Sequence, residues 1–240
     1  MKKRFNPQVF DLKTVFMQRI ADYVRLGYRH YVLGEVPAGR AQALAEKLNR
    51  RYQVGQDRNQ RARAKASGDG CAILLLYTPP TASGKDAGVP TARLHTPSIH
   101  WALLVTPGAH PAHTLERLKD AWQRDQRIPL TGYELVQLSR KDSARASWTW
   151  RMTGETYEAW RERVIDIARK RTCSEHVLFA DLYAAPGFSG IRSQVGKIVG
   201  LFRREWKRHR SEAFPKLPHL FYAQRLPNRG TPLNRLAKSE

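Results

Sequence analysis

The spacing of apolar and polar positions along the chain changes from segment to segment. In several segments the apolar residues recur every three or four positions, which places them on one face of an α-helix. Within residues 8–26, Leu12, Phe16 and Tyr23 share such a face, and Arg25 lies off it. We therefore expect helices at residues 8–26, 40–52, 111–124, 154–171, 175–184 and 191–210.

The strand pattern has a different form. Two uninterrupted apolar runs, at 71–77 and 99–105, predict strands that are buried on both faces. Residues 133–138 and 147–152 alternate between apolar and polar, and residues 29–36 are β-like. From residue 29 onward, the first six of these elements, up to the strand at 133–138, match the βαββαβ pattern. The expected fold class is α+β: a ferredoxin-like antiparallel sheet with a helix before it and a basic helical module after it.

Charge and turn signals divide the predicted elements into four parts. An amphipathic helix at 1–27 precedes an α+β sheet domain at 28–172. Residues 173–212 contain two predicted helices joined by a glycine-containing turn, which is typical of a helix-turn-helix-like module. Four prolines punctuate the remainder, so residues 213–240 are expected to form an extended basic tail.

The chain is strongly basic, with 42 Lys and Arg against 21 Asp and Glu, a formal net charge of +21. The excess is seven charges in residues 1–54 and seven in residues 173–240. Such a field attracts polyanions, and nucleic acid is the first expectation. No apolar run approaches the roughly 18 residues that a membrane span needs. The basic N-terminus has no apolar signal-peptide core, so we expect a cytoplasmic protein with no membrane partner.

The strongest candidate site is the predicted helix at 191–210. Its apolar residues fill one arc at 100° per residue. Its opposite side is almost entirely basic, with Glu205 as the one acidic residue there, whereas a solvated helix face normally mixes charges of both signs. The predicted phosphate contacts are Arg192, Lys197, Arg203, Arg204, Lys207, Arg208 and Arg210.

A second candidate lies at residues 55–69, which have almost no apolar side chains. If the segment is helical, Arg58, Arg61 and Lys65 share one face. Either this segment adds phosphate contacts or it is an ordinary solvated connector. The residues predicted to contact nucleic acid here are Arg58, Arg61, Arg63 and Lys65.

Aromatic residues of the predicted sheet leave an RNA-binding alternative open, because sheet aromatics can stack on unpaired bases. Trp148 and Trp150 alternate along one strand and so share a face. Aromatics at such positions more often belong to the core. The residues concerned are Tyr31, Tyr77, Trp101, Trp148 and Trp150.

Little in the sequence favours an enzyme, and we expect no catalytic residues, no cofactor and no metal site. Two cysteines, Cys71 and Cys173, cannot form a four-thiolate site, and Cys71 opens an apolar run where a buried thiol fits. A metal-dependent nicking or strand-transfer enzyme of the HUH class remains the enzymatic alternative. It would use His95 and His100, together with a tyrosine nucleophile. The tyrosines that could serve are Tyr157, Tyr183 and Tyr222.

Residues 186–195 read Pro-Gly-Phe-Ser-Gly-Ile-Arg-Ser-Gln-Val. With the basic helix after it, this segment resembles accessory proteins of bacterial conjugative and integrative elements, which implies DNA binding in replication, mobilisation or regulation of a mobile element. The βαββαβ order is similar to the scaffold of replication initiators. HUH initiators carry two histidines separated by one residue, but His95 and His100 are five positions apart.

These observations together predict a DNA-binding protein without catalytic activity, with DNA favoured over RNA. A structural subunit of a nucleoprotein assembly, with protein partners in the same complex, is the further alternative.

Overall fold

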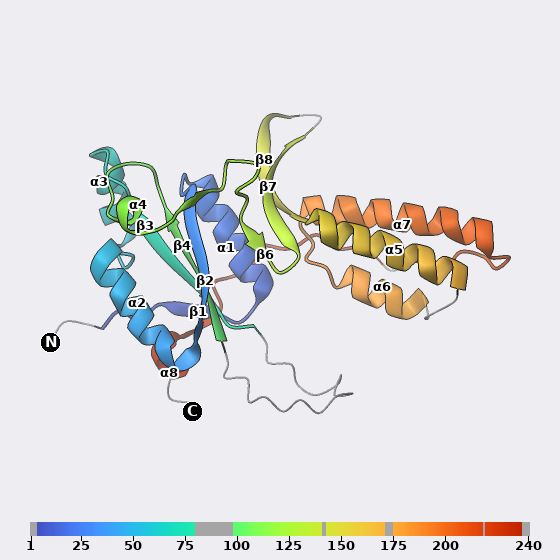
Figure 1. The fold of residues 1–240 in the computed structure, drawn as a ribbon, viewed down its shortest axis with the longest axis horizontal. Coiled ribbons are helices and arrows are strands. Elements are labelled where there is room, and N and C mark those ends of the chain that lie inside the picture. Colours follow the sequence, from blue (N-terminus) through green and yellow to red (C-terminus); the bar gives the residue numbers. More distant parts are fainter. Residues whose placement is uncertain (1–3, 80–97, 141–142, 171–174, 218, 237–240) are drawn as a thin grey trace. The chain divides into compact units, whose positions relative to one another are not determined.

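The chain folds into two compact units with mixed α+β structure (Figure 1). The computed structural model describes residues 4–79, 98–140, 143–170, 175–217 and 219–236. Unit 1 comprises residues 1–126 and 226–240, and unit 2 comprises residues 127–225. Among the described residues, no helix has both the length and the apolar character needed to cross a bilayer.

Unit 1 is built around a six-stranded mixed sheet. Its elements are β1 (Gln8–Phe10), α1 (Lys13–Arg25), β2 (His30–Pro37), α2 (Ala38–Tyr52), α3 (Arg58–Ala66), β3 (Ala72–Tyr77), β4 (Ser98–Val105), α4 (Ala112–Leu115), β5 (Lys119–Asp120), β9 (Gly230–Pro232) and α8 (Leu233–Leu236). The strand order is β5-β2-β4-β3-β1-β9. Strands β2 and β3 both run antiparallel to β4, which lies between them, so β2, α2 and β3 form a split βαβ unit.

Helices pack on both faces of this sheet. Leu74, Leu103 and Val105 belong to a buried cluster that also contains residues of α2, α4 and α8. On the other face α1 contacts β3 and β4, and the ring of Phe16 stacks on that of Tyr77 with centroids 5.5 Å apart. The apolar runs at 71–77 and 99–105 are continuous because both faces of β3 and β4 are covered.

Unit 2 consists of a three-stranded sheet and three helices. Its elements are β6 (Pro129–Leu130), β7 (Tyr133–Arg140), β8 (Ser143–Met152), α5 (Gly154–Lys170), α6 (Glu175–Tyr183) and α7 (Ser189–His209). Helix α7 packs against α5 and β8. The side chain of Trp150 is fully buried. Rings of Phe179, Phe202, Trp206 and Phe214 meet edge to face with centroids 5.5–6.3 Å apart.

The α+β class is confirmed, but the ferredoxin-like topology is not. Strands β7 and β8 correspond to the predicted strands at 133–138 and 147–152, and they pair with each other in unit 2. They therefore supply no strand to the larger sheet. The boundary between the units falls inside the range 28–172 that the sequence pattern groups as one domain. Within the predicted module at 173–212, the second helix, α7, packs against α5 and β8.

Two local predictions are wrong for identifiable reasons. Residues 8–10 are a strand, because Val9 and Phe10 pair with β3, and the helix begins at Lys13. The predicted helix at 111–124 reduces to the single turn of α4. Beyond it, β5 pairs with β2 and the buried Asp120 binds Arg29, contacts that outweigh local helix propensity.

The predicted tail at 213–240 is partly ordered against unit 1. Strand β9 pairs antiparallel with β1, and the backbone N–H of Leu233 donates to the carbonyl of Pro7 at 3.0 Å. Leu233 is buried in the same core as α2. Burial of this leucine contributes about 1.5–3 kcal/mol, which adds to the backbone hydrogen bonds that hold the segment on β1.

Candidate nucleic-acid interface

Helix α7 has one buried and one exposed face, as its sequence predicts. The buried residues include Ile191, Val195, Ile198, Phe202 and Trp206. Its first turn lies close to β8, since a Cβ on Gly190 would stand 2.5 Å from the carbonyl oxygen of Trp150. Gly190 N–H and the Ser189 hydroxyl also contact the Thr149 hydroxyl. This packing fixes which side of α7 faces solvent.

Of the seven basic residues predicted on α7, two are structural contacts. The Arg210 guanidinium donates to the carbonyls of Ala168 at 2.9 Å and Ile167 at 2.7 Å, in the last turn of α5. It also lies 4.7 Å from the ring centroid of Trp206. Arg192 donates to the carbonyl of Leu220 and lies over the ring of Tyr222. Both side chains hold unit 2 together.

Two more of the seven, Arg208 and Arg203, each contact a neighbouring side chain. Arg208 pairs with Glu205 at 2.9 Å, and Arg203 lies 5.0 Å from the ring centroid of Phe214. Glu205 is buried and also contacts Arg169 and His209. Burial tends to raise the pKa of the Glu205 carboxyl, but the hydrogen bond and charge of Arg169, with the charges of Arg208 and His209, bring that pKa below 4.5. Glu205 therefore stays ionised and offsets charge near the end of α7.

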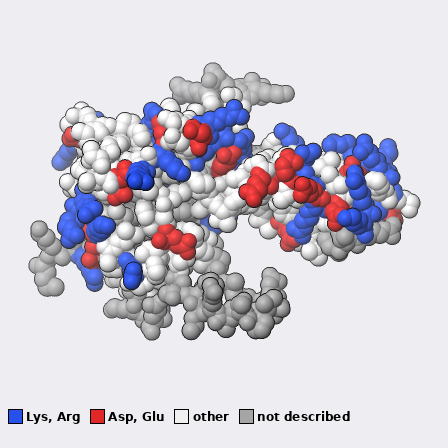
Figure 2. All heavy atoms as spheres, viewed as in Figure 1, with Lys and Arg blue, Asp and Glu red and all other residues white. Residues whose placement is uncertain are grey.

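The remaining three, Lys197, Arg204 and Lys207, are exposed, and no ion pair is found for them in the described part of the chain. On the face shown in Figure 2, basic side chains gather over the C-terminal half of α7. These three residues, together with Arg203, which is exposed and has no ion pair in the described part of the chain either, are the charges on α7 that remain available to a ligand.

Two adjoining hollows run along the exposed side of α7 where it meets α5 and β8. One has a volume of about 590 Å³ and the other about 360 Å³, and both are lined by Tyr157, Ser193 and Lys197. We call this surface the α5–α7 groove. Every charged residue that lines it is basic: Arg151, Arg161, Lys197 and Arg204.

The floor of the groove is made of small residues. Ser193, Gly196 and Gly200 follow one another along the exposed face of α7, and a Cβ added to Gly196 would meet nothing within 4 Å. A ligand can therefore approach the helix closely. Two of the flanking arginines have acidic partners, since Arg151 pairs with Glu134 and Arg161 with Glu158, each at 2.6 Å. Lys197 and Arg204 carry the free charge of the groove.

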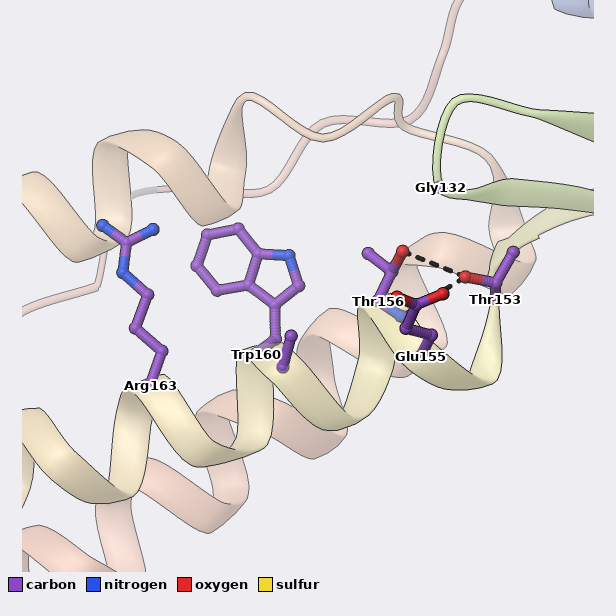
Figure 3. Close-up of a pocket in the computed structure, with 7 residues that line it drawn as sticks. Gly132, Thr153, Glu155, Thr156, Trp160 and Arg163 are labelled. Atoms are coloured by element: carbon purple, nitrogen blue, oxygen red, sulfur yellow. Dashed lines mark hydrogen bonds between the residues drawn. The ribbon is translucent and has the colours of Figure 1, made fainter.

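A third hollow in unit 2, about 560 Å³, differs in charge (Figure 3). Trp160 and Arg163 rise from the same side of α5, and the hydroxyls of Thr153 and Thr156 are 3.0 Å apart. Its lining includes Glu155, and Arg163 pairs with Asp181 at 2.5 Å. Because acidic groups offset its one basic residue, this hollow has no preference for a polyanion.

In unit 1 the predicted segment at 55–69 does contain a helix, α3. Its start has a capping box, in which Asp57 and Gln60 each bind the backbone N–H of the other. Arg61 donates to the Gln56 carbonyl. Lys65 donates to the Leu26 carbonyl at 3.1 Å and lies 4.4 Å from the ring centroid of Tyr28.

These contacts divide the predicted set on α3. Arg58 and Arg63 are exposed, whereas Arg61 and Lys65 make contacts within unit 1. Half of the predicted residues therefore help to hold α3 on unit 1.

The sequence reading missed a basic face on α2. Its buried residues Ala41, Ala45, Leu48 and Tyr52 fix the orientation of the helix. Basic side chains also gather over α2 in Figure 2. The same 100° spacing that predicts the apolar stripe could have revealed this face. Its exposed basic residues are Arg40, Lys47, Arg50 and Arg51.

The aromatic residues of the two sheets are not a binding platform. Tyr31, Tyr77, Trp148 and Trp150 are all buried, and Trp101 packs against the core of unit 1. Four of the five rings are buried and the fifth is partly buried, so the structure does not support the RNA-binding alternative that depends on them.

Within the described ranges, no three His, Cys, Asp or Glu side chains lie close enough together to hold a metal ion. His100 lies on β4 with its ring 6.1 Å from that of Tyr77, which is buried. His95 lies outside the described residues, as does Cys173. Tyr157 lines the α5–α7 groove, Tyr183 is half-buried and Tyr222 is exposed. The described histidines and tyrosines form no HUH-like constellation.

Comparison with models of protein families, with curated proteins and with solved structures finds no match.

Proposed function

We propose that this protein binds nucleic acid, with DNA as the favoured ligand, and that the phosphate backbone lies in the α5–α7 groove. The observation that carries the proposal is the sign of the charges in this groove. Four basic residues and no acidic residue are found among the described residues that line it. A concave basic surface concentrates a polyanion near it and releases counterions when the polyanion binds.

The shape of the groove supports backbone contact. The small side chains of Ser193, Gly196 and Gly200 allow phosphates to approach α7, and Lys197 and Arg204 stand beside this floor. Arg204 can bind a phosphate through two parallel hydrogen bonds, whereas Lys197 acts as a point charge. Lys207, one turn further along α7, extends the basic surface. These contacts hold a backbone without reading base sequence.

The proposal extends to a cytoplasmic protein that acts on the DNA of a mobile element. Supporting this extension are the net charge of +21 and the resemblance of residues 186–195 to accessory proteins of conjugative and integrative elements. The basic face of α2 is a separate surface of unit 1 that could also contact phosphates.

The test is the salt dependence of DNA binding, measured by fluorescence anisotropy with a labelled 20-nucleotide single strand and the matching duplex. Removing two phosphate contacts with the double variant Lys197→Gln and Arg204→Gln should flatten the slope of log K against log salt. The expected change is about 1.4 for the single strand and about 1.8 for the duplex.

A matched control removes two other exposed positive charges from unit 2. Arg163 and Lys170 both have acidic partners, Asp181 at 2.5 Å and Asp166 at 2.6 Å, and neither lines the groove. Arg163→Gln with Lys170→Gln should leave the slope nearly unchanged. Equal losses in the two double variants would mean that net charge alone drives binding and would refute the groove as the site.

A further inference from the structure

Residues 219–223 of unit 2 expose two aromatic rings to solvent. Phe221 is 74% exposed and Tyr222 is 67% exposed, more than any other large hydrophobic side chain in the described ranges. We call this segment the aromatic ledge. Most of the surface of these two adjacent rings contacts solvent and not protein. Adjacent exposed apolar side chains of this kind are a candidate contact surface for a binding partner.

The backbone of the aromatic ledge is fixed against the connection between α6 and α7. Ala223 N–H donates to the Gly187 carbonyl at 2.8 Å, and Arg192 donates to the Leu220 carbonyl. A Cβ on Gly187 would stand 2.5 Å from the Ala223 nitrogen and 2.6 Å from the Phe221 oxygen. Only glycine allows this close approach. The two rings are thus presented from an anchored backbone.

The ring of Tyr222 has a cation against one side. The Arg192 guanidinium carbon lies 3.5 Å from the ring centroid, which places it over the face of the ring. The ring of Phe221 contacts that of His219 edge to face, with centroids 4.5 Å apart. Each ring therefore contacts one neighbouring side chain, and most of its remaining surface is exposed to solvent.

The charge near the aromatic ledge identifies the chemistry of its partner. At 100° per residue, Arg192 and Lys197 lie about 140° apart around α7, at the two edges of its exposed face. The ledge is attached at the Arg192 edge, and the α5–α7 groove lies at the Lys197 edge. Exposed aromatic rings beside a basic track are the arrangement by which proteins bind single strands, with bases stacked on rings and phosphates on cations.

We propose that Phe221 and Tyr222 stack on unpaired bases of a DNA strand whose phosphates follow the exposed face of α7. This inference rests on the proposed function and adds to it a preference for single-stranded over duplex DNA. In a duplex the faces of the bases are stacked on one another, so the rings of the aromatic ledge have nothing to stack on.

The test compares two 20-nucleotide strands, one normal and one with several abasic sites, which keep the phosphates but lack the bases. The unmodified protein should bind the normal strand at least about tenfold more tightly, since each stacked base contributes about 1–3 kcal/mol. The double variant Phe221→Ala and Tyr222→Ala should lose this preference. Its affinity for duplex DNA should stay within about twofold of the starting value.

Two further variants serve as controls. Tyr222→Phe keeps the aromatic ring and should retain the preference. Val177→Ala removes another exposed apolar side chain of unit 2, 52% exposed, and should have no effect. A strand of RNA with the same sequence, bound in the same assay, shows whether the unpaired base or the DNA sugar is recognised; tighter binding of RNA than of DNA would overturn the DNA part of the proposal.

The outcomes separate this inference from the proposed function. If the unmodified protein binds neither strand nor duplex, the proposed function itself fails. If it binds both but the alanine double variant keeps its preference for normal over abasic strands, only the aromatic ledge is refuted. A double variant that instead changes the sedimentation coefficient of the free protein would show that the ledge is a protein contact, which also overturns the inference.

Discussion

Arg210 is one of two residues on α7, with Arg192, for which the sequence predicts a phosphate contact and the structure shows a structural contact. The basic pattern of α7 predicts a phosphate contact, but the guanidinium binds the carbonyls of Ile167 and Ala168. These two carbonyls belong to the last turn of α5, where backbone acceptors have no partner within the helix. A cation at this end also complements the helix dipole. Arg210 therefore caps α5, and we expect Arg210→Gln to lower the free energy of unfolding.

The magnitude follows from the contacts that the variant removes. Each hydrogen bond from a charged donor contributes about 1.5–3 kcal/mol, and the cation–π contact with Trp206 about 0.5–1 kcal/mol. Water reaches this half-buried side chain and replaces part of each contact, so we expect a total loss of about 2–3 kcal/mol. Lys207→Gln, three residues earlier and exposed, should change the free energy of unfolding by less than about 0.5 kcal/mol.

The assay is urea unfolding followed by tryptophan fluorescence, because Trp150 and Trp206 report on unit 2. DNA affinity is measured under conditions in which both variants are folded. Arg210→Gln should be less stable with unchanged DNA affinity, and Lys207→Gln should be stable with weaker DNA binding. An Arg210→Gln protein of full stability that binds DNA poorly would refute the assignment of Arg210 as a cap.

Two other predictions concern partly or fully buried groups of unit 1. Burial, with the charge of His113 adding to it, lowers the pKa of His30 below 6.5, and burial lowers that of His110. The unfolded chain therefore binds more protons than the folded one as pH falls through about 6.5, so Tm should fall between pH 7 and pH 5. The double variant His30→Gln and His110→Gln should show a smaller fall, and an equal fall would contradict this cause. Burial raises the pKa of the Cys71 thiol and shields it from reagents. A thiol reagent at pH 8 should therefore label Cys71 in the folded protein at least about tenfold more slowly than in urea. Equal labelling rates would contradict the burial of this thiol.

Several helices and strands could be predicted because their apolar residues follow a regular pattern along the sequence. The 3.6-residue pattern of α2, α5 and α7, and the continuous apolar runs of β3 and β4, reflect burial that the sequence displays directly. The prediction that Cys71 is a buried thiol is confirmed for the same reason, since it is 1% exposed.

The larger topology could not be predicted because it depends on contacts between distant segments. Strand β9 pairs with β1 more than 200 positions away, and two short strands of three residues carry no clear pattern. The hairpin of β7 and β8 is local, but its packing against α7, instead of a place in the six-stranded sheet, again involves segments that are far apart in the sequence. The local propensity of a segment does not determine which distant segment it pairs or packs with.

The candidate site could be predicted only in part. Charge on α7 identified the helix, but it could not separate Arg192 and Arg210, which bind carbonyls of neighbouring segments, from Lys197 and Arg204, which face the groove. Tyr157 and Arg161 of α5 complete the groove, and no sequence pattern indicated that they line the same surface as α7. Which basic residues remain available is a property of the folded neighbours.

The most direct test of the central claim is acetylation footprinting of lysines with and without bound DNA. Lys197 lines the α5–α7 groove and Lys207 extends its basic surface, whereas Lys170 on α5 pairs with Asp166 and lies outside the groove. Bound DNA should protect Lys197 and Lys207 several-fold and leave Lys170 unchanged. If DNA binds while Lys197 and Lys207 react as fast as in the free protein, the backbone lies elsewhere and the account is contradicted.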